Sequence, residues 1–173
     1  LKEIPEEERA LYNEKLIDSL YLKFQENEVD DEKVIQFLKD KMKGRHLLVT
    51  APGKSILEEK EKIKEQIEQD DVFVICVNSI PDYIAPDILF ISNQKRYHQI
   101  KQIYGIKNLT CPVVLTSNID AGKSSKYVVN YSDLTMSDTM ISDNACLMLF
   151  NLLIKMGIDE ICVAGFDGYH TNV

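Results

Sequence analysis

Two hydrophobic periods alternate along this chain and predict its secondary structure. Short continuous apolar runs, typical of strands buried on both faces, occupy residues 47–49, 72–77, 87–91, 112–116 and 158–164, with a weaker run at 126–130. Between these runs, apolar residues recur at helical spacing after residue 55, from 93 to 104 and from 144 to 156. The last of these helices is apolar nearly all round, which predicts deep burial. Alternating strands and helices predict an α/β fold, a Rossmann-like three-layer sandwich with a mostly parallel sheet.

Two further helices are expected before the first strand. Pro5 and the glutamates after it favour a first helical turn, and a second helix runs from about residue 31 to Gly44. We therefore expect a helical hairpin over residues 1–44 and the Rossmann-like domain over residues 45–173. The hairpin either links an absent upstream domain or packs on the sheet, and the sequence leaves both readings open. Because the chain opens on Leu1 without Met and stops just after a motif-like stretch, we expect a fragment whose domain is truncated at its C-terminus.

Composition narrows the classes of partner. Lys and Arg number 20 against 28 Asp and Glu, and the net charge of −8 disfavours nucleic acid and anionic membranes as partners. No apolar run approaches the roughly 18 residues of a membrane span, and no signal peptide is visible. The four cysteines show no C-x-x-C spacing, which predicts reduced core residues of a cytoplasmic protein rather than metal ligands: Cys76, Cys111, Cys146 and Cys162.

The turn after the first strand is the first candidate for ligand chemistry. Pro52-Gly53 breaks the apolar run, and Ser55 with Glu58 three residues later predicts a capping box at a helix N-terminus. Such a turn directs backbone N–H groups and a positive helix dipole at one point, which suits a phosphate. It is neither a P-loop, because Leu48 stands where the first glycine is needed, nor a G-x-G-x-x-G motif. An ordinary strand–turn–helix corner is the alternative.

Small polar residues recur where the other strands end. In an open α/β sheet, ligands bind outside the carboxyl ends of the strands, and an amide side chain supplies both a donor and an acceptor. The strand at 72–77 ends at Asn78, where NAD enzymes carry an acidic ribose ligand, so NAD is not expected. The predicted ligand and phosphate site comprises Pro52, Gly53, Lys54, Ser55, Asn78, Asn93, Lys95, Arg96, Ser117 and Asp167. Each polar residue taken singly also fits a turn or a helix cap, and no catalytic residue can be assigned.

Four motifs, in order, resemble a bacterial sialyltransferase-like superfamily. They are APGKSI at 51–56, Val77-Asn78, Ser92-Asn93 and AGFDGY at 164–169. The resemblance implies a Rossmann-like nucleotide-binding fold in which Gly53, Ser55, Asn78 and Asn93 hold the CMP part of a CMP-sugar. It also implies that Asp167 shapes the site near the sugar. The turn differs from the Gly-Pro-Ser of the transferases, and their catalytic histidine lies downstream of the G-x-D motif, beyond this chain.

A second resemblance covers almost the whole chain. Segments 4–9, 51–56 and 92–97 are similar to the C-terminal extension of bacterial 4-hydroxy-2-oxovalerate aldolase-like proteins, which carry an upstream TIM barrel of the HMG-CoA-lyase type. This implies that metal-dependent C–C bond chemistry and its divalent metal belong to that absent barrel, so no cofactor is expected here. The scattered His46, His98 and His170 show no ligand spacing for a metal.

Three functions remain open from the sequence. The first is a nucleotide or nucleotide-sugar binding module appended to an aldolase barrel in the same polypeptide. The second is a glycosyltransferase-like enzyme that uses a CMP- or NDP-activated sugar. The third is a structural domain for oligomer assembly, and a homo-oligomer is compatible with all three.

Overall fold

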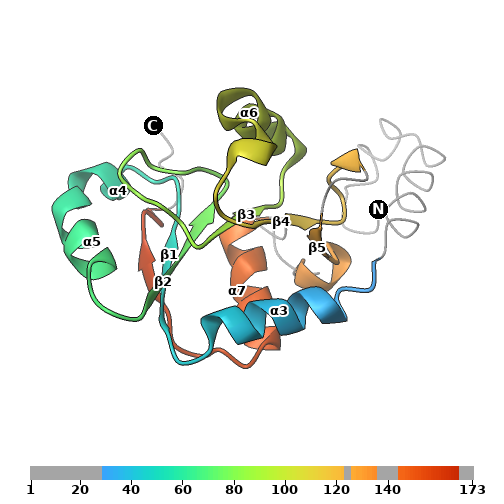
Figure 1. Cartoon of the computed structure of the whole chain (residues 1–173), viewed down its shortest axis with the longest axis horizontal. Helices are drawn as coiled ribbons and strands as arrows, with labels where there is room; N and C mark the ends of the chain where they lie inside the picture. Colours follow the sequence, from blue (N-terminus) through green and yellow to red (C-terminus); the bar gives the residue numbers. More distant parts are fainter. Residues whose placement is uncertain (1–28, 123–125, 136–143, 168–173) are drawn as a thin grey trace, which may run out of the picture.

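The computed structural model describes residues 29–122, 126–135 and 144–167, so the first expected helix lies outside the described residues (Figure 1). In chain order the described elements are α3 (Glu32–Met42), β1 (His46–Thr50), α4 (Ser55–Glu58), α5 (Lys60–Ile67), β2 (Val72–Val77), β3 (Ile88–Ile91), α6 (Gln94–Tyr104), the 3-10 turn η1 (Ile106–Asn108), β4 (Val113–Thr116), β5 (Tyr127–Val129), the 3-10 turn η3 (Ser132–Leu134), α7 (Ala145–Lys155) and β6 (Cys162–Ala164). The expected alternation of strands and helices is confirmed.

The strands of the described part of the chain form one six-stranded sheet in the order β5-β4-β3-β2-β1-β6. Every pairing is parallel, and the register places His46 opposite Val72 and Val49 opposite Val163. Parallel sheets are covered on both faces, which explains why these strands read as continuous apolar runs rather than as alternating ones. The α/β fold with a parallel sheet is thus confirmed.

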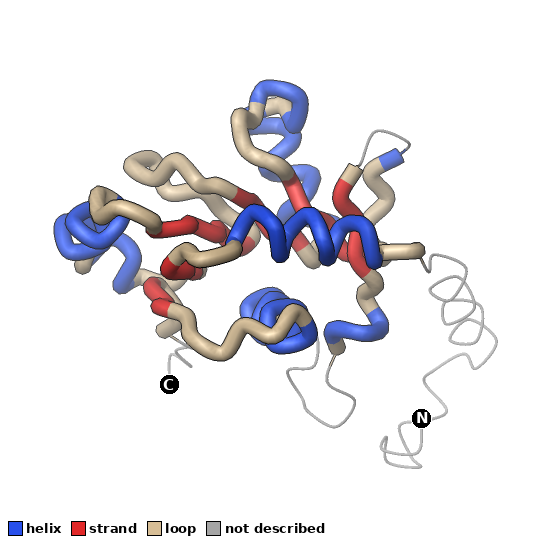
Figure 2. Tube along the Cα trace, turned by 60° about the horizontal axis from the view of Figure 1, so that its bottom comes forward, coloured by secondary structure: helices blue, strands red, loops and turns tan. Residues whose placement is uncertain are grey.

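Helices cover both faces of the sheet, which gives the three layers of the sandwich. Leu47 and Val49 of β1 point to one face, where they pack with α3 and α7, while Leu48 points to the face covered by α4, α5 and α6. Figure 1 shows α3 and α7 below the strands and α6 above them. Figure 2, turned so that the lower side comes forward, shows α3 in front of the strands and α7 below α3.

The strand order creates a topological switch point between β1 and β6. From β1 the chain adds neighbouring strands in one direction as far as β5, and it then returns through α7 on the opposite face to pair β6 with the other side of β1. In open α/β sheets the ligand crevice lies at such a point, outside the carboxyl ends of the strands. The residues that follow β1 and β6 therefore lie where a ligand crevice is expected.

The sheet edge at β6 departs from expectation. The expected strand at 158–164 is shortened to Cys162–Ala164, and its first two residues are exposed. The prediction that all four cysteines lie in the core is therefore wrong for Cys162, and Cys111 is only half-buried. The physical reason is position, because β6 has no strand beyond it in the described sheet. The expected deep burial of α7 is also incomplete, because Ile154 on this helix is 68% exposed.

Candidate functional site

A cleft of about 770 Å³ lies over the carboxyl ends of β1, β2, β3 and β6. Most of the predicted site residues line it together: Pro52, Gly53, Asn78, Asn93, Lys95, Arg96 and Asp167. They come from four separate segments of the chain, which the parallel register brings to one edge of the sheet. The volume is within the range of small-molecule sites in proteins.

One wall of the cleft is the first turn of α6. The Asn93 side chain accepts hydrogen bonds from the backbone N–H groups of Lys95 and Arg96 at 2.9 and 3.2 Å, so Asn93 is the N-cap of this helix. The side chains of Lys95 and Arg96 are exposed at the cleft. Two cationic side chains and the positive end of an 11-residue helix therefore face the same space.

The floor of the cleft is built by Asn78 and Ser92. Asn78 has a left-handed backbone with φ of 57°, and its N–H donates to Phe90 O at 2.9 Å. Its side-chain oxygen accepts from the N–H of Ser92 at 3.3 Å. Asparagine tolerates this backbone better than most residues, and its side chain links the ends of β2 and β3. Asn78 thus has a structural role at the point where the resemblance places a ligand contact.

The opposite wall is the N-terminus of α7. Asn144 caps this helix, since its side chain accepts from the N–H groups of Cys146 and Leu147 at 3.0 and 3.3 Å. Cys146 lines the cleft, and burial raises the pKa of its thiol to about 11. A thiol with that pKa stays protonated near neutral pH, so it contributes an uncharged surface and no thiolate nucleophile.

The turn after β1 is closed by the segment after β6. Backbone N–H groups of Ala51 and Gly53 donate to Ala164 O and Gly165 O, both at 2.8 Å. Ser55 N–H donates to Asp167 Oδ2 at 2.7 Å, and the Ser55 hydroxyl donates to Asp167 Oδ1. The expected capping box is therefore wrong. Ser55 is the first residue of α4 rather than its N-cap, and Lys54 makes no side-chain cap.

The reason for this difference is electrostatic. An ionised carboxylate is a stronger acceptor for the Ser55 N–H and hydroxyl than a local backbone partner. The expected single helix after the turn is also divided, because α4 ends at Glu58 and α5 begins at Lys60. The strand–turn–helix order is nevertheless retained.

Three predicted residues lie away from the cleft. Lys54 is exposed and does not line it, and Ser55 lines a second hollow beside β6, on the other side of the Asp167 contact. Ser117 follows β4, where its hydroxyl accepts from the N–H of Tyr131 at 3.1 Å. The hydroxyl groups of Ser55 and Ser117 therefore stabilise local structure, and neither these residues nor Lys54 line the cleft.

Other residues of the cleft were not predicted as site residues. They include Gln99 on α6, Asn144 and Cys146 on α7, and Phe166, which is 46% exposed. The Phe166 ring packs edge-on against Phe150, with ring centroids 5.8 Å apart. The position of Asn144 directly before the apolar run at 145–155 is a sequence signal for an N-cap. That Asn144 lines the same cleft as the turn after β1 follows only from the strand order.

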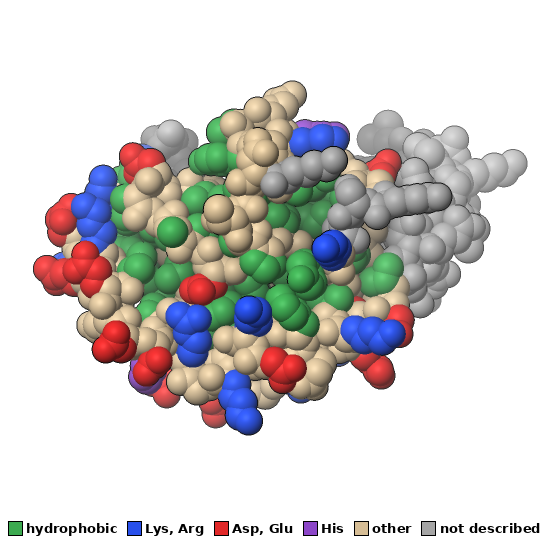
Figure 3. Space-filling view, viewed as in Figure 1, with side chains coloured by type: hydrophobic (Ala, Val, Ile, Leu, Met, Phe, Trp, Pro, Cys, Tyr) green, Lys and Arg blue, Asp and Glu red, His purple; other side chains and the backbone are tan. Residues whose placement is uncertain are grey.

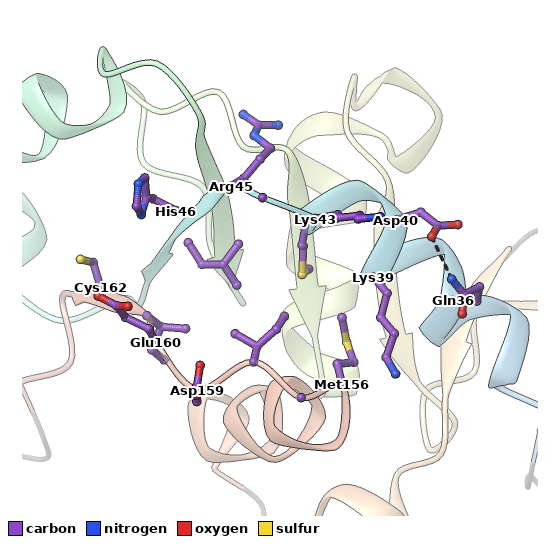
Figure 4. A pocket seen from close by; sticks show the side chains of 16 residues that line it. Gln36, Lys39, Asp40, Lys43, Arg45, His46, Met156, Asp159, Glu160 and Cys162 are labelled. Carbon is purple, nitrogen blue, oxygen red and sulfur yellow. Dashed lines mark hydrogen bonds between the residues drawn. The ribbon is translucent and has the colours of Figure 1, made fainter.

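A second cavity, of about 550 Å³, lies at the amino-terminal ends of the strands, opposite the cleft (Figure 4). It is bounded by the C-terminal ends of α3 and α7 and by the first residues of β1 and β6, among them His46 and Cys162. Lys39, Lys43 and Arg45 share it with acidic side chains such as Asp159 and Glu160. Positive and negative side chains are therefore mixed in this cavity, and none of the predicted site residues lines it.

Charge elsewhere on the surface is mixed. Figure 3 shows acidic and basic side chains interspersed around the rim of one face, with apolar side chains gathered in its middle. Within the residues described by the structure, no group of three or more His, Cys, Asp or Glu side chains is placed to hold a metal ion. In the same part of the chain, no helix has the length and apolar character to cross a membrane.

Comparison of the chain with protein-family models, curated proteins and solved structures gives no match. The likeness to a sialyltransferase-like superfamily and to an aldolase extension therefore stays a prediction from the motifs. The evidence for function is the geometry of the cleft: a cationic wall at α6, a capped helix end at α7, and a floor of asparagine and serine.

Proposed function

We propose that this domain binds a phosphorylated small molecule, of the nucleotide or nucleotide-sugar class, in the cleft over β1, β2 and β3. The observation that carries the proposal is the convergence of Lys95, Arg96 and the N-termini of α6 and α7 on one cavity. Positive charge at this place contrasts with a chain whose net charge is −8. A phosphoryl group suits this place, because the positive end of a helix dipole stabilises an anion and arginine can donate two parallel hydrogen bonds to it.

Phe166 favours a nucleotide over a simple phosphate. Its ring is 46% exposed at the cleft and is steadied by Phe150. An exposed aromatic ring offers a stacking surface to a nucleobase. The resemblance to the aldolase extension adds to this proposal that the domain binds its ligand beside a catalytic barrel in the same polypeptide.

A thermal-shift titration with CMP, CDP, UDP, ADP, GDP and NAD tests the proposal. A ligand that binds only the folded state stabilises it by about 2.7 kcal/mol at about 100 times its Kd. For a chain of this size that stabilisation corresponds to a rise in Tm of about 5 to 10 °C. A saturable rise with one nucleotide identifies the base that the cleft prefers, whereas no rise with any of them at millimolar concentration contradicts the proposal.

Paired charge variants locate the binding. The double variant Lys95→Gln/Arg96→Gln should weaken nucleotide binding about tenfold or more, because charge-assisted hydrogen bonds contribute about 1.5–3 kcal/mol each. The matched control is Lys62→Gln/Lys64→Gln on α5, which removes the same charge at exposed i,i+3 ion pairs outside the cleft. Equal weakening in both double variants would indicate a nonspecific charge effect.

A further inference from the structure

The anion position that the turn after β1 provides is already occupied by the protein. Ser55 N–H donates to one oxygen of the Asp167 carboxylate at 2.7 Å, and the Ser55 hydroxyl donates to the other. These are the two donors that a phosphate at this turn would use. Asp167 thus supplies, from a segment far along the chain, the negative charge that the turn favours.

Oxygen atoms of the protein also crowd Gly53 in this turn. A Cβ built on Gly53 would lie 2.3 Å from Gly165 O and 2.6 Å from Asp167 Oδ2, both well inside van der Waals contact. The N–H of Gly53 is already bonded to Gly165 O at 2.8 Å. A phosphoryl group that approaches this turn would therefore be repelled by the Gly165 carbonyl oxygen and by the Asp167 carboxylate.

The cleft therefore has two ends of opposite charge. Asp167 and Phe166 line it at the end of β6, and Lys95 and Arg96 line it at α6. A ligand phosphoryl group is repelled from the first end and attracted to the second. A carboxylate has several acceptor positions, so Asp167 can also accept from a hydroxyl or amino group of a ligand.

We infer that Asp167 is a specificity-determining residue that excludes phosphoryl groups from the turn after β1 and orients the ligand with its phosphoryl end at Lys95 and Arg96 and its hydroxyl- or amino-bearing end at Asp167 and Phe166. This inference rests on the proposed function and names the ligand class of that site more closely. It removes the turn at Gly53 and Ser55 from the predicted phosphate site and keeps Lys95 and Arg96 in it.

Amide chemical-shift mapping with inorganic pyrophosphate tests the inference on the wild-type chain. The expected result is a saturable shift of the backbone amides of Lys95 and Arg96, with the amides of Gly53 and Ser55 unchanged. A shift of the Gly53 or Ser55 amide overturns the inference but keeps the proposed anion-binding function. If no amide of the cleft responds at millimolar pyrophosphate, both the inference and the proposed function fail.

The variant Asp167→Asn gives a second reading at nearly constant side-chain size. Removing the negative charge should tighten pyrophosphate binding several-fold, and the Ser55 amide should begin to respond. Unchanged affinity with a silent Ser55 amide overturns the inference. The control Asp133→Asn removes an exposed carboxylate that pairs with Lys155 outside the cleft, so it should leave pyrophosphate binding as in the wild type.

Discussion

Replacing Gly165 by alanine should destabilise the domain strongly, because two separate costs meet at this residue. Its backbone is left-handed, with φ of +73°, and a Cβ built there would lie 2.1 Å from Ala51 O and 3.1 Å from Ala51 C. Both atoms belong to backbone and cannot rotate away as a flexible side chain can. The chain after β6 must therefore move away from the turn after β1.

The magnitude follows from what that movement breaks. A non-glycine residue in the left-handed region costs about 1 kcal/mol. The backbone hydrogen bonds from Ala51 to Ala164 and from Gly53 to Gly165, both 2.8 Å long, flank the clash and would lengthen. Each contributes about 1 kcal/mol, so the expected loss of unfolding free energy is about 3 kcal/mol. That is a large share of the roughly 5–15 kcal/mol that stabilises a typical domain.

Gly44 provides a matched control for the backbone cost. Its φ is +72°, and a Cβ built there meets no atom within 4 Å. Gly44→Ala should therefore cost only the conformational part, about 1 kcal/mol. Urea unfolding of both variants, followed by circular dichroism, measures the two free energies and shows whether the slope m is unchanged.

The comparison isolates the steric contact between the two loops. If Gly165→Ala loses no more stability than Gly44→Ala, the close approach of Gly165 to Ala51 does not exist in solution. The cleft wall built from the ends of β1 and β6 would then be incorrect. A Gly165→Ala variant that is completely unfolded at 25 °C would have lost more than the expected value of about 3 kcal/mol, since a typical domain is stabilised by about 5–15 kcal/mol.

Four further predictions concern core packing, thiol reactivity, pH dependence and a helix cap. Leu152→Ala, on the buried face of α7, should lower the free energy of unfolding in urea by about 2–5 kcal/mol. Ile154→Ala removes a side chain that is 68% exposed and should lower it by less than about 0.5 kcal/mol. Similar losses in the two variants would contradict the assigned buried face of the helix. The exposed Cys162 should react with Ellman's reagent in the folded protein, and the buried Cys76 only after unfolding. Burial raises the pKa of the Cys76 thiol from 9.0 to about 11. The contribution of this thiol to stability is therefore complete below pH 9.0 and is lost as pH rises through about 11. In Cys76→Ala, the free energy of unfolding measured in urea should no longer show this loss between pH 9.0 and about 11. Asn93→Ala removes the acceptor for two backbone N–H groups at the start of α6 and should cost about 1 kcal/mol, with no loss expected if the cap is not formed.

The sequence predicted the elements of the sandwich well, because their signals are local. Continuous apolar runs and helical spacing depend only on neighbours in the chain, and parallel strands buried on both faces produce runs such as Val72–Val77. The gathering of polar residues at the strand ends was also predictable, since all carboxyl ends of a parallel sheet lie at one edge. Asn78, Asn93, Lys95 and Arg96 meet there for this reason.

The limits of the sequence appear at the sheet edge and in the buried side chains. Cys162 was expected in the core because its neighbours are apolar, but β6 pairs on one side only in the described sheet, and Cys162 is exposed. Similarly, the apolar pattern of α7 did not show which side faces water. Burial depends on what lies above a residue, and that is set by strand order rather than by composition.

The kinds of element, their order and the strand ends at which polar groups gather all follow from local sequence patterns. The partners of those polar groups within the protein depend on long-range packing. Ser55 meets Asp167 across 112 positions of sequence, because the strand order places β6 beside β1. The sequence pattern around Ser55 is that of a helix N-terminus that can bind an anion. In the structure the Asp167 carboxylate occupies that position. A local pattern can specify an anion position, but only long-range packing decides whether the protein or its ligand occupies it.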